Sequence, residues 1–198
     1  MIFKHILGKY KIILTFLMND ADLSPIIVPE PPEDMRELYY KIDKIINEAE
    51  LKYKINWQVK FAGFPNQPAE YYYGWREYKR HIIDETEYPA NVNKEAARRK
   101  FINKKATQML FRLNEGNGRA LYLIGVEDNG IANGINQDEV LTTLVNFICM
   151  TDIIKGSIIR TFNIYKTTES IKNKIEKYVC TFRIILDTSK DIDTSALI

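Results

Sequence analysis

Cysteine, histidine and long hydrophobic runs are scarce in this chain of 198 residues, which contains two cysteines and two histidines. The spacing of these four residues does not fit a zinc site. Both cysteines, Cys149 and Cys180, lie in apolar patterns typical of small buried thiols, so a reducing compartment and a cytoplasmic location are expected. The apolar run at 12–18 is too short to cross a bilayer, and we expect no membrane partner.

The first 33 residues leave two interpretations open. Early positive charges and the short apolar run fit either a strand-like lead-in or a targeting segment, although no small-residue cleavage pattern follows. Four prolines in 24–33 predict an extended linker, because proline fixes φ and removes a donor. At the other end, residues 188–198 have the polar composition of a poorly ordered tail.

Strong net charge and a phosphate-binding loop are also lacking. The chain has 28 basic and 26 acidic residues, so its overall charge does not indicate nucleic-acid binding. The string GxxxxGK[ST] is absent, and the glycines of GNGRALYLIG follow a helical pattern and precede a strand. A dinucleotide fingerprint has the opposite order, so we expect no GTP site and no other nucleotide cofactor.

What is present is a sequence of helical and strand periodicities. A helix at 34–50 and a strand at 55–61 form a preamble within residues 34–70. Residues 71–187 then predict a β-α-β-β-α-β-β core, of class α+β, with a mixed, mostly antiparallel sheet and helices on one side. Its expected elements are strands at about 75–83, 119–127 and 131–135, helices at 94–114 and from 136, and strands at 157–166 and 177–187.

Three local sequence signals mark where elements of this core begin or end. Gly116 or Gly118 is expected to end the helix in a left-handed conformation. The string DNG at 128–130 predicts a hairpin turn. Asn136 and Glu139 have the spacing of a capping box at the start of the next helix.

Acidic residues offer one candidate chemistry. Glu77 lies in the first core strand, while Glu127 and Asp128 end the next strand. Carboxylates at neighbouring strand ends can hold Mg²⁺ or Mn²⁺ for phosphodiester cleavage. The alternative is structural, because aspartate is favoured at turn positions such as 128.

A basic stripe offers another candidate site. At 100° per residue, one face of the 94–114 helix carries basic residues with an aromatic beside them: Lys94, Arg98, Phe101, Lys105 and Arg112. Such a stripe could bind an RNA backbone. Lysine and arginine are also good helix formers on a solvated face, so the pattern alone leaves both interpretations open.

The region 107–144 contains the string TQMLFRLNEGNGRALYLIGVEDNG, which resembles the N-terminal region of the elongation-factor-Tu-like GTP-binding proteins 1 and 2. In that family a TQM-like helix precedes an LxEGxGEAxYxIGVEDxG segment. The positions that fit are Thr107, Gln108, Met109, Arg112, Leu113, Glu115, Gly116, Gly118, Ala120, Tyr122 and the run 124–130. The likeness extends over about 75–187.

The resemblance implies the N-terminal module alone, because this sequence has none of the GTPase motifs. Arg119 also departs from the glutamate that the family usually has there. We therefore expect a truncated or split gene product, or a free-standing module, in a translation-related setting. Its expected partners are RNA, a ribonucleoprotein or a separately encoded GTPase.

A further likeness is to the AlbA-type domain of Schlafen proteins, which resembles this β-α-β-β pattern. Schlafen nucleases use two glutamates and an aspartate, one glutamate in an ExK-like string. Glu77 precedes Lys79 in that way, and Asp128 fits the aspartate, but the remaining glutamate position is Tyr72. A metal-dependent ribonuclease using Glu77 and Asp128, with Glu70 or Glu127 as a substitute, is the alternative function.

Overall fold

A computed structural model describes residues 33–50, 55–83, 93–173 and 176–186. Predictions for residues 1–32 and 187–198 lie outside this part of the chain. The helices are η1 (Glu33–Met35), α2 (Arg36–Glu50), α3 (Lys94–Glu115), α4 (Gln137–Ile153) and α5 (Thr168–Asn173). The strands are β1 (Asn56–Phe64), β2 (Arg76–Lys79), β3 (Arg119–Ile124), β4 (Ser157–Thr167) and β5 (Tyr178–Leu186).

The strands form one mixed sheet in the order β1-β4-β5-β3-β2. β5 lies at its centre and pairs antiparallel with β4 and β3, whereas β1 pairs parallel with β4 and β2 parallel with β3. The class α+β and the mixed sheet are confirmed. Parallel and antiparallel pairs are equal in number, because α3 carries the chain back so that β3 runs alongside β2 in the same direction.

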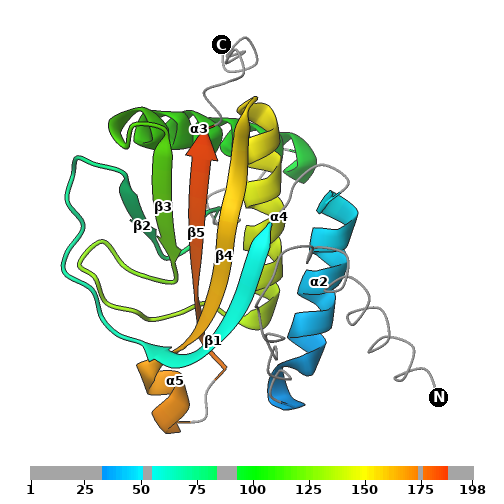
Figure 1. Cartoon of the computed structure of the whole chain (residues 1–198), viewed down its shortest axis with the longest axis vertical. Helices are drawn as coiled ribbons and strands as arrows, with labels where there is room; N and C mark the ends of the chain where they lie inside the picture. Colours follow the sequence, from blue (N-terminus) through cyan, green and yellow to red (C-terminus); the bar gives the residue numbers. More distant parts are fainter. Residues whose placement is uncertain (1–32, 51–54, 84–92, 174–175, 187–198) are drawn as a thin grey trace, which may run out of the picture. The chain divides into compact units, whose positions relative to one another are not determined.

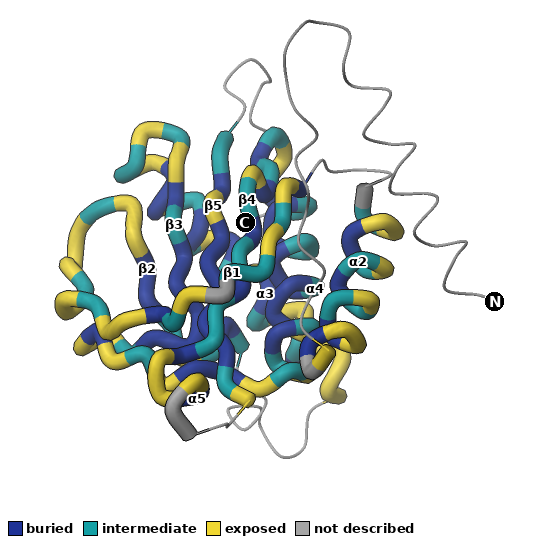
Figure 2. Tube along the Cα trace, turned by 60° about the horizontal axis from the view of Figure 1, so that its bottom comes forward, coloured by how far each residue is buried: buried dark blue, intermediate teal, exposed yellow. Residues whose placement is uncertain are grey.

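Helices α2, α3 and α4 cover one face of the sheet (Figure 1). The main core lies between them and the strands, with α3 contributing Ala106 and Met109, and α4 contributing Leu144 and Phe147. Figure 2 shows the buried residues concentrated in this layer. Phe147 stacks on Phe182 of β5 with ring centroids 3.9 Å apart, so aromatic packing links α4 to the centre of the sheet.

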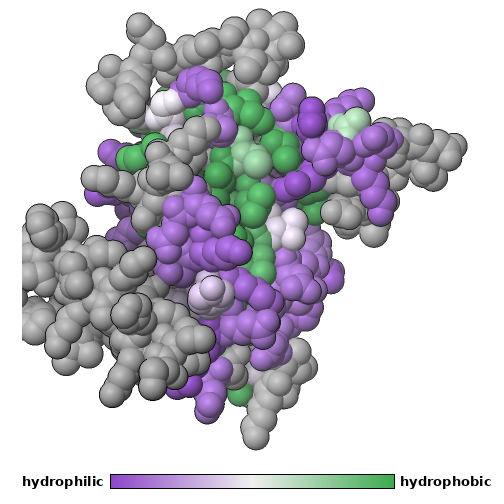
Figure 3. Space-filling model, turned by 90° about the vertical axis from the view of Figure 1, so that its right-hand side faces the viewer, coloured by the Kyte–Doolittle hydropathy of each residue, from purple (hydrophilic) through white to green (hydrophobic). Residues whose placement is uncertain are grey.

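The predicted preamble belongs to this same core. β1 is an edge strand of the sheet, and Leu38, Ile42 and Ile46 of α2 are fully buried with the α4 residues. The rings of Tyr39 and Trp57 lie 4.3 Å apart and join α2 to β1. Viewed from this side, hydrophilic residues border a narrow hydrophobic strip (Figure 3).

The opposite face of the sheet is only partly covered. A smaller apolar cluster contains Phe64, Tyr78, Leu123, Val126 and Val179. Next to it, the segments at 65–70 and 127–131 hydrogen bond to each other, from Gln67 N to Gly130 O and from Glu70 N to Asp128 O, both at 2.8 Å.

The expected return strand at 131–135 is wrong. The DNG turn forms, with the Gly130 amide donating to the Glu127 carbonyl at 2.7 Å. After it, only Ile135 makes a sheet contact, as an isolated bridge to Tyr178. β3 is already paired on both sides, with β5 and β2, so the segment after the turn cannot add to it as a hairpin strand. The Asn136–Glu139 capping box that starts α4 is confirmed.

The other boundaries follow the sequence closely. The strand predicted at 75–83 is shorter, covering only Arg76–Lys79, because the chain leaves the sheet at its edge. Cys180 is buried, and burial raises the pKa of its thiol, while Cys149 is partly buried. Each helix in the described part of the chain is too short or too polar to cross a membrane.

Candidate functional site

Glu77 is a buried carboxylate on the helix-covered face of the sheet. It lies beside Tyr122 in the parallel pairing of β2 with β3, and its neighbours Arg76 and Tyr78 point to the opposite face. Only 1% of its surface is exposed. An ionised carboxylate at such a position needs charged or hydrogen-bonding partners, because transfer out of water otherwise costs several kcal/mol.

Those partners come from α3 and from β2 itself. Arg112 Nε lies 2.5 Å from Glu77 Oε2, and Gln108 Nε2 donates to Glu77 Oε1 at 2.7 Å. Lys79 Nζ lies 2.8 Å from the same Oε1. Gln108 and Arg112 are four residues apart and therefore share the α3 face that packs on β2.

The rest of the Arg112 guanidinium holds the segment that precedes β2. Its Nη1 donates to the carbonyl oxygens of Tyr72 at 3.0 Å and Gly74 at 3.1 Å. Glu115 Oε2 accepts from the same Nη1 and from the Gly74 amide, both at 3.1 Å. Nη2 lies 3.2 Å from Glu70 Oε1. We call Glu70, Glu77, Lys79, Gln108, Arg112 and Glu115 the Arg112 network.

Burial and neighbouring charges shift the pKa values of three groups of this network, Glu70, Lys79 and Arg112. Burial, reinforced by the nearby Glu77 charge, raises the pKa of Glu70 despite the opposing effects of Lys79 and Arg112. Burial alone would lower the pKa of Lys79, but its hydrogen bond to Glu77 and the negative charges around it raise that pKa overall. Lys79 is therefore a fixed cation among carboxylates.

This arrangement bears directly on the predicted nuclease residues. Lys79 Nζ lies between Glu77, at 2.8 Å, and Asp128 Oδ1, at 3.5 Å. The ammonium thus occupies the position between the two carboxylates that a shared metal ion would need, and Glu70, a proposed substitute, faces Arg112. Among the described residues, no group of three or more acidic, histidine or cysteine side chains could hold a metal ion.

The residues of the predicted basic stripe on α3 differ in their burial, from exposed to buried. Arg112 is 7% exposed and lies inside the network, so little of its side chain is accessible at the surface that was predicted to contact RNA. Arg98 is partly buried, with Nη2 donating to Asn146 Oδ1 at 2.9 Å. Phe101 and Lys105 are partly buried, and Lys94 is exposed. At the C-terminal end of α3, the stripe faces β2 rather than solvent. Helical spacing shows which residues share one face of a helix, but it does not show what that face packs against.

Lys105 and Asp128 nevertheless meet at one surface feature. Both line an open depression beside the network, together with Lys79, Arg80, His81, Glu127 and Asn129. Opposite charges pair within it, as Arg80 Nη1 and Glu127 Oε1 do at 3.4 Å. The depression is therefore a mixed-charge surface.

A more uniform positive surface lies on the uncovered part of the sheet. Strand register places Arg76, Leu121, Arg183, Thr161 and Asn56 in one row across all five strands. This row alternates with the row of Glu77, Tyr122 and Phe182, so it faces away from the helices. Arg119 shares that face, two residues before Leu121. We call the surface formed by Arg76, Arg119, Arg183, Thr161 and Asn56 the open face.

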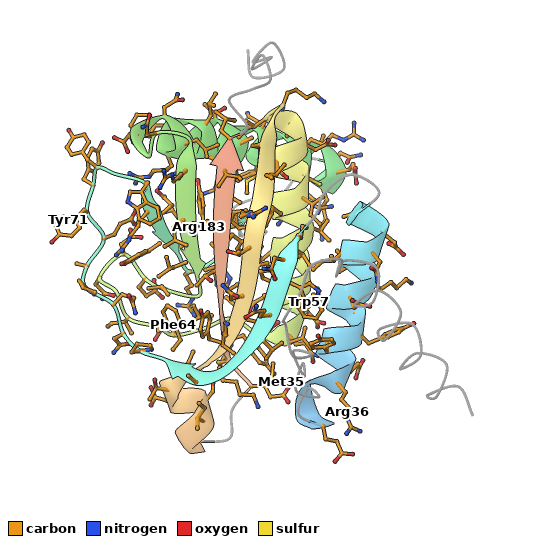
Figure 4. All side chains as sticks on the ribbon, in the orientation of Figure 1. Met35, Arg36, Trp57, Phe64, Tyr71 and Arg183 are labelled. Carbon is orange, nitrogen blue, oxygen red and sulfur yellow. The ribbon has the colours of Figure 1, made fainter. Side chains whose placement is uncertain are left out.

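The charged side chains of the open face are all positive. Arg76, Arg119 and Arg183 are exposed, and none has an ion pair with a described residue. The five strands described above contain one acidic residue, Glu77, which points to the helices. Arg183 lies on the front of the sheet in Figure 4. The chain therefore has a locally positive surface although its basic and acidic residues are nearly equal in number.

The glycine-rich stretch at 114–130 connects the end of α3 to β3 and to the turn that follows β3. Gly118 takes a left-handed conformation, with φ of +81°, and its amide donates to Leu113 O at the end of α3. Gly116 is needed for another reason: a Cβ there would lie 2.5 Å from Trp75 Cβ and 1.8 Å from Arg119 O. The close approach lets Trp75 pack against the end of α3.

Comparison with known proteins gives a partial match. GTP-binding protein 2 of Mus musculus and that of Homo sapiens are each 32% identical to this chain over 94 residues, covering 48% of the chain and 14% of their own length. Uncharacterized protein R625 of Acanthamoeba polyphaga mimivirus is 33% identical over 92 residues, covering 46% of the chain and 43% of its own length. No family model and no solved structure matches. The similarity supports a link to the GTP-binding protein family.

Sequence reasoning missed the open face and the Arg112 network. A visible signal was the near-absence of acidic residues from the strand-forming segments. The three arginines come from separate strands, and only the pairing of those strands makes them neighbours. Arg112 and Glu77 likewise come from a helix and a strand with no local relation between them.

Proposed function

We propose that this chain is a non-catalytic RNA-binding module, equivalent to the N-terminal region of the GTP-binding protein family and acting in a translation-related setting. The observation that carries the RNA part is the open face, where three arginines are exposed on one face of the sheet while Glu77, the one acidic residue of the five strands, points to the helices. Arginine is suited to phosphate because its planar guanidinium can donate two parallel hydrogen bonds.

The spacing of these arginines suits a chain of phosphates. Arg76 and Arg183 flank Leu121 on adjacent strands, so their Cα atoms are about 10 Å apart at the usual strand separation. Arg119 lies two residues along β3 from Leu121, about 7 Å away. Three cations at this spacing can contact successive or nearby phosphates of one strand, and such contacts supply much of RNA affinity.

The non-catalytic part of the proposal is supported by the Arg112 network. Its carboxylates are paired with cations: Arg112 with Glu70, Glu77 and Glu115, and Lys79 with Glu77. A nuclease would need those carboxylates turned toward a metal ion and a scissile phosphate. The translation setting comes from the resemblance to the GTP-binding proteins, and the cytoplasmic location from the apolar patterns around the two cysteines.

The test compares RNA affinity among charge-matched variants. Arg76→Gln/Arg119→Gln/Arg183→Gln should bind a fluorescently labelled, unstructured RNA at least about tenfold more weakly than the unchanged protein, and its salt dependence should be shallower by about 0.7 per lost phosphate contact. The control Arg99→Gln/Lys100→Gln/Lys104→Gln removes the same charge from exposed positions of α3 and should stay within about twofold.

A third variant tests the earlier α3 interpretation. Lys94→Gln/Arg98→Gln/Lys105→Gln changes the part of the stripe outside the Arg112 network. If that variant alone loses RNA, the contact surface is α3 and the open-face assignment is overturned. If the unchanged protein retains no RNA at low salt, the RNA-binding function itself is overturned.

A further inference from the structure

An exposed aromatic segment lies directly before β2. Tyr71, Tyr72 and Tyr73 are 82%, 82% and 74% exposed, and Trp75 is 36% exposed. Aromatic side chains are normally buried for most of their surface, so four within five residues form an unusual apolar surface. The labelled Tyr71 points away from the body of the molecule in Figure 4.

This segment is held in place from beneath. Arg112 binds the carbonyl oxygens of Tyr72 and Gly74, and Glu115 accepts the Gly74 amide. The rings of Tyr72 and Tyr73 pack edge to face with centroids 4.9 Å apart. Backbone groups of Tyr72 and Gly74 therefore hydrogen bond to the Arg112 network, while the tyrosine rings are exposed to solvent. A preorganised aromatic surface loses little conformational freedom when a ligand stacks on it.

The segment is continuous with the open face. Arg76 follows Trp75 in sequence, and its guanidinium carbon lies 5.3 Å from the centroid of the Trp75 ring. Arg76 is also the first arginine of the open-face row. Aromatic rings and phosphate-binding cations are thus adjacent, which is the combination that proteins use to bind single strands.

We propose that Tyr71, Tyr72, Tyr73 and Trp75 form a stacking platform for unpaired bases, so that the module selects single-stranded over double-stranded RNA. This proposal rests on the RNA-binding function above and names its substrate class. A duplex hides its base faces within its own stack, whereas an unpaired base can lie on a tyrosine or tryptophan ring. The positive charge of the neighbouring open face favours a nucleic acid over an apolar protein segment as the occupant.

The experiment measures binding of labelled single-stranded RNA and of a duplex of the same length, longer than one typical site of roughly 4–16 nucleotides. We expect the unchanged protein to prefer the single strand. Tyr71→Ala/Tyr72→Ala/Tyr73→Ala should weaken single-strand binding at least about tenfold while leaving duplex affinity and the salt slope unchanged, because it removes stacking but no charge.

Matched variants exclude a general effect on folding. Tyr40→Ala removes another exposed tyrosine, on α2, and should leave RNA affinity unchanged. Tyr71→Phe/Tyr72→Phe/Tyr73→Phe keeps the rings and should bind like the unchanged protein. Circular dichroism melting should give similar midpoints for all of these variants, since the exchanged side chains are exposed.

The outcomes separate this proposal from the one it rests on. If the unchanged protein binds RNA but the alanine variant binds single strands equally well, or loses single strand and duplex alike, the stacking platform is overturned and RNA binding stands. If the alanine variant loses only a co-purifying protein, the tyrosines belong to a protein interface and the platform is again overturned. Absence of RNA binding in the unchanged protein overturns both.

Discussion

Arg112 Nε lies 2.5 Å from Oε2 of Glu77, and both side chains are buried between α3 and β2. Nη1 of the same guanidinium donates to the carbonyl oxygens of Tyr72 and Gly74 in the aromatic segment. One side chain therefore joins a helix, an edge strand and the exposed tyrosines. Breaking such a buried pair leaves an uncompensated charge, which costs more than the intact pair contributes.

Glu77→Gln should lower the free energy of unfolding by roughly 3–5 kcal/mol, because Arg112 and Lys79 would lose their shared buried anion. Urea denaturation followed by circular dichroism measures this. The control Glu95→Gln disrupts an exposed pair with Arg99 on α3 and should cost less than about 1 kcal/mol. Equal effects of the two substitutions would contradict a stabilising role for the network.

Arg112→Lys should loosen the aromatic segment more than the rest of the sheet. Lysine keeps the charge but lacks the planar fork that reaches Glu77 and two carbonyls at once. We expect faster amide hydrogen exchange at Gly74, whose N–H donates to Glu115, with little change at Phe182 in the central strand. Unchanged protection at Gly74 would show that Arg112 does not hold the segment. Arg99→Lys is the matched control.

The Glu70 carboxyl should titrate above its ordinary pKa of 4.5, because burial and the Glu77 charge disfavour its ionised form. The folded state then holds this proton more tightly than the unfolded state. Its contribution to stability is fully present below pH 4.5 and is lost as the pH rises through the folded-state pKa.

Two measurements check that sign. Carboxyl-detected NMR should place the Glu70 midpoint above 4.5. The stability of the unchanged protein relative to Glu70→Gln should fall as the pH increases through that window. A midpoint below 4.5 would mean that Arg112 and Lys79 outweigh burial.

Incubation with labelled tRNA and Mn²⁺ should give no cleavage that depends on Glu77 or Asp128. Lys79 Nζ lies 2.8 Å from Glu77 and 3.5 Å from Asp128, so a cation already occupies the space between them. The unchanged protein and Asp128→Asn should yield the same RNA fragments on a denaturing gel. Mn²⁺-dependent cleavage that disappears in Asp128→Asn would restore the nuclease hypothesis.

Periodic elements of the fold were predictable because their causes are local. The α3 helix, expected at 94–114, is observed at Lys94–Glu115, where Asn93 caps its start. The Asn136–Glu139 box starts α4 as expected, since both partners lie within one turn. The strand at 131–135, expected because it follows the DNG hairpin signal, is wrong, since β3 is already paired with β5 and β2 and only Ile135 forms a bridge, to Tyr178.

The candidate sites were less predictable. The helical stripe correctly aligned Arg98, Lys105 and Arg112, but periodicity cannot distinguish a stripe that faces solvent from one that faces a buried glutamate. Glu77 was singled out as an acid with functional potential. Its partners decide its role, and they come from α3 and from the side chain two positions further along β2.

The sequence by itself determined the three long helices α2, α3 and α4, most strands, the turn glycines and the likeness to the GTP-binding protein family, because each depends on residues close together in the chain. The short helix α5, at Thr168–Asn173, was not predicted. Tertiary structure alone decided that Arg112 is buried, that Lys79 separates Glu77 from Asp128, and that Arg76, Arg119 and Arg183 share a face. Ion pairs and surface charge depend on distances in space, and those distances are set only when the strands pair and α3 packs on them.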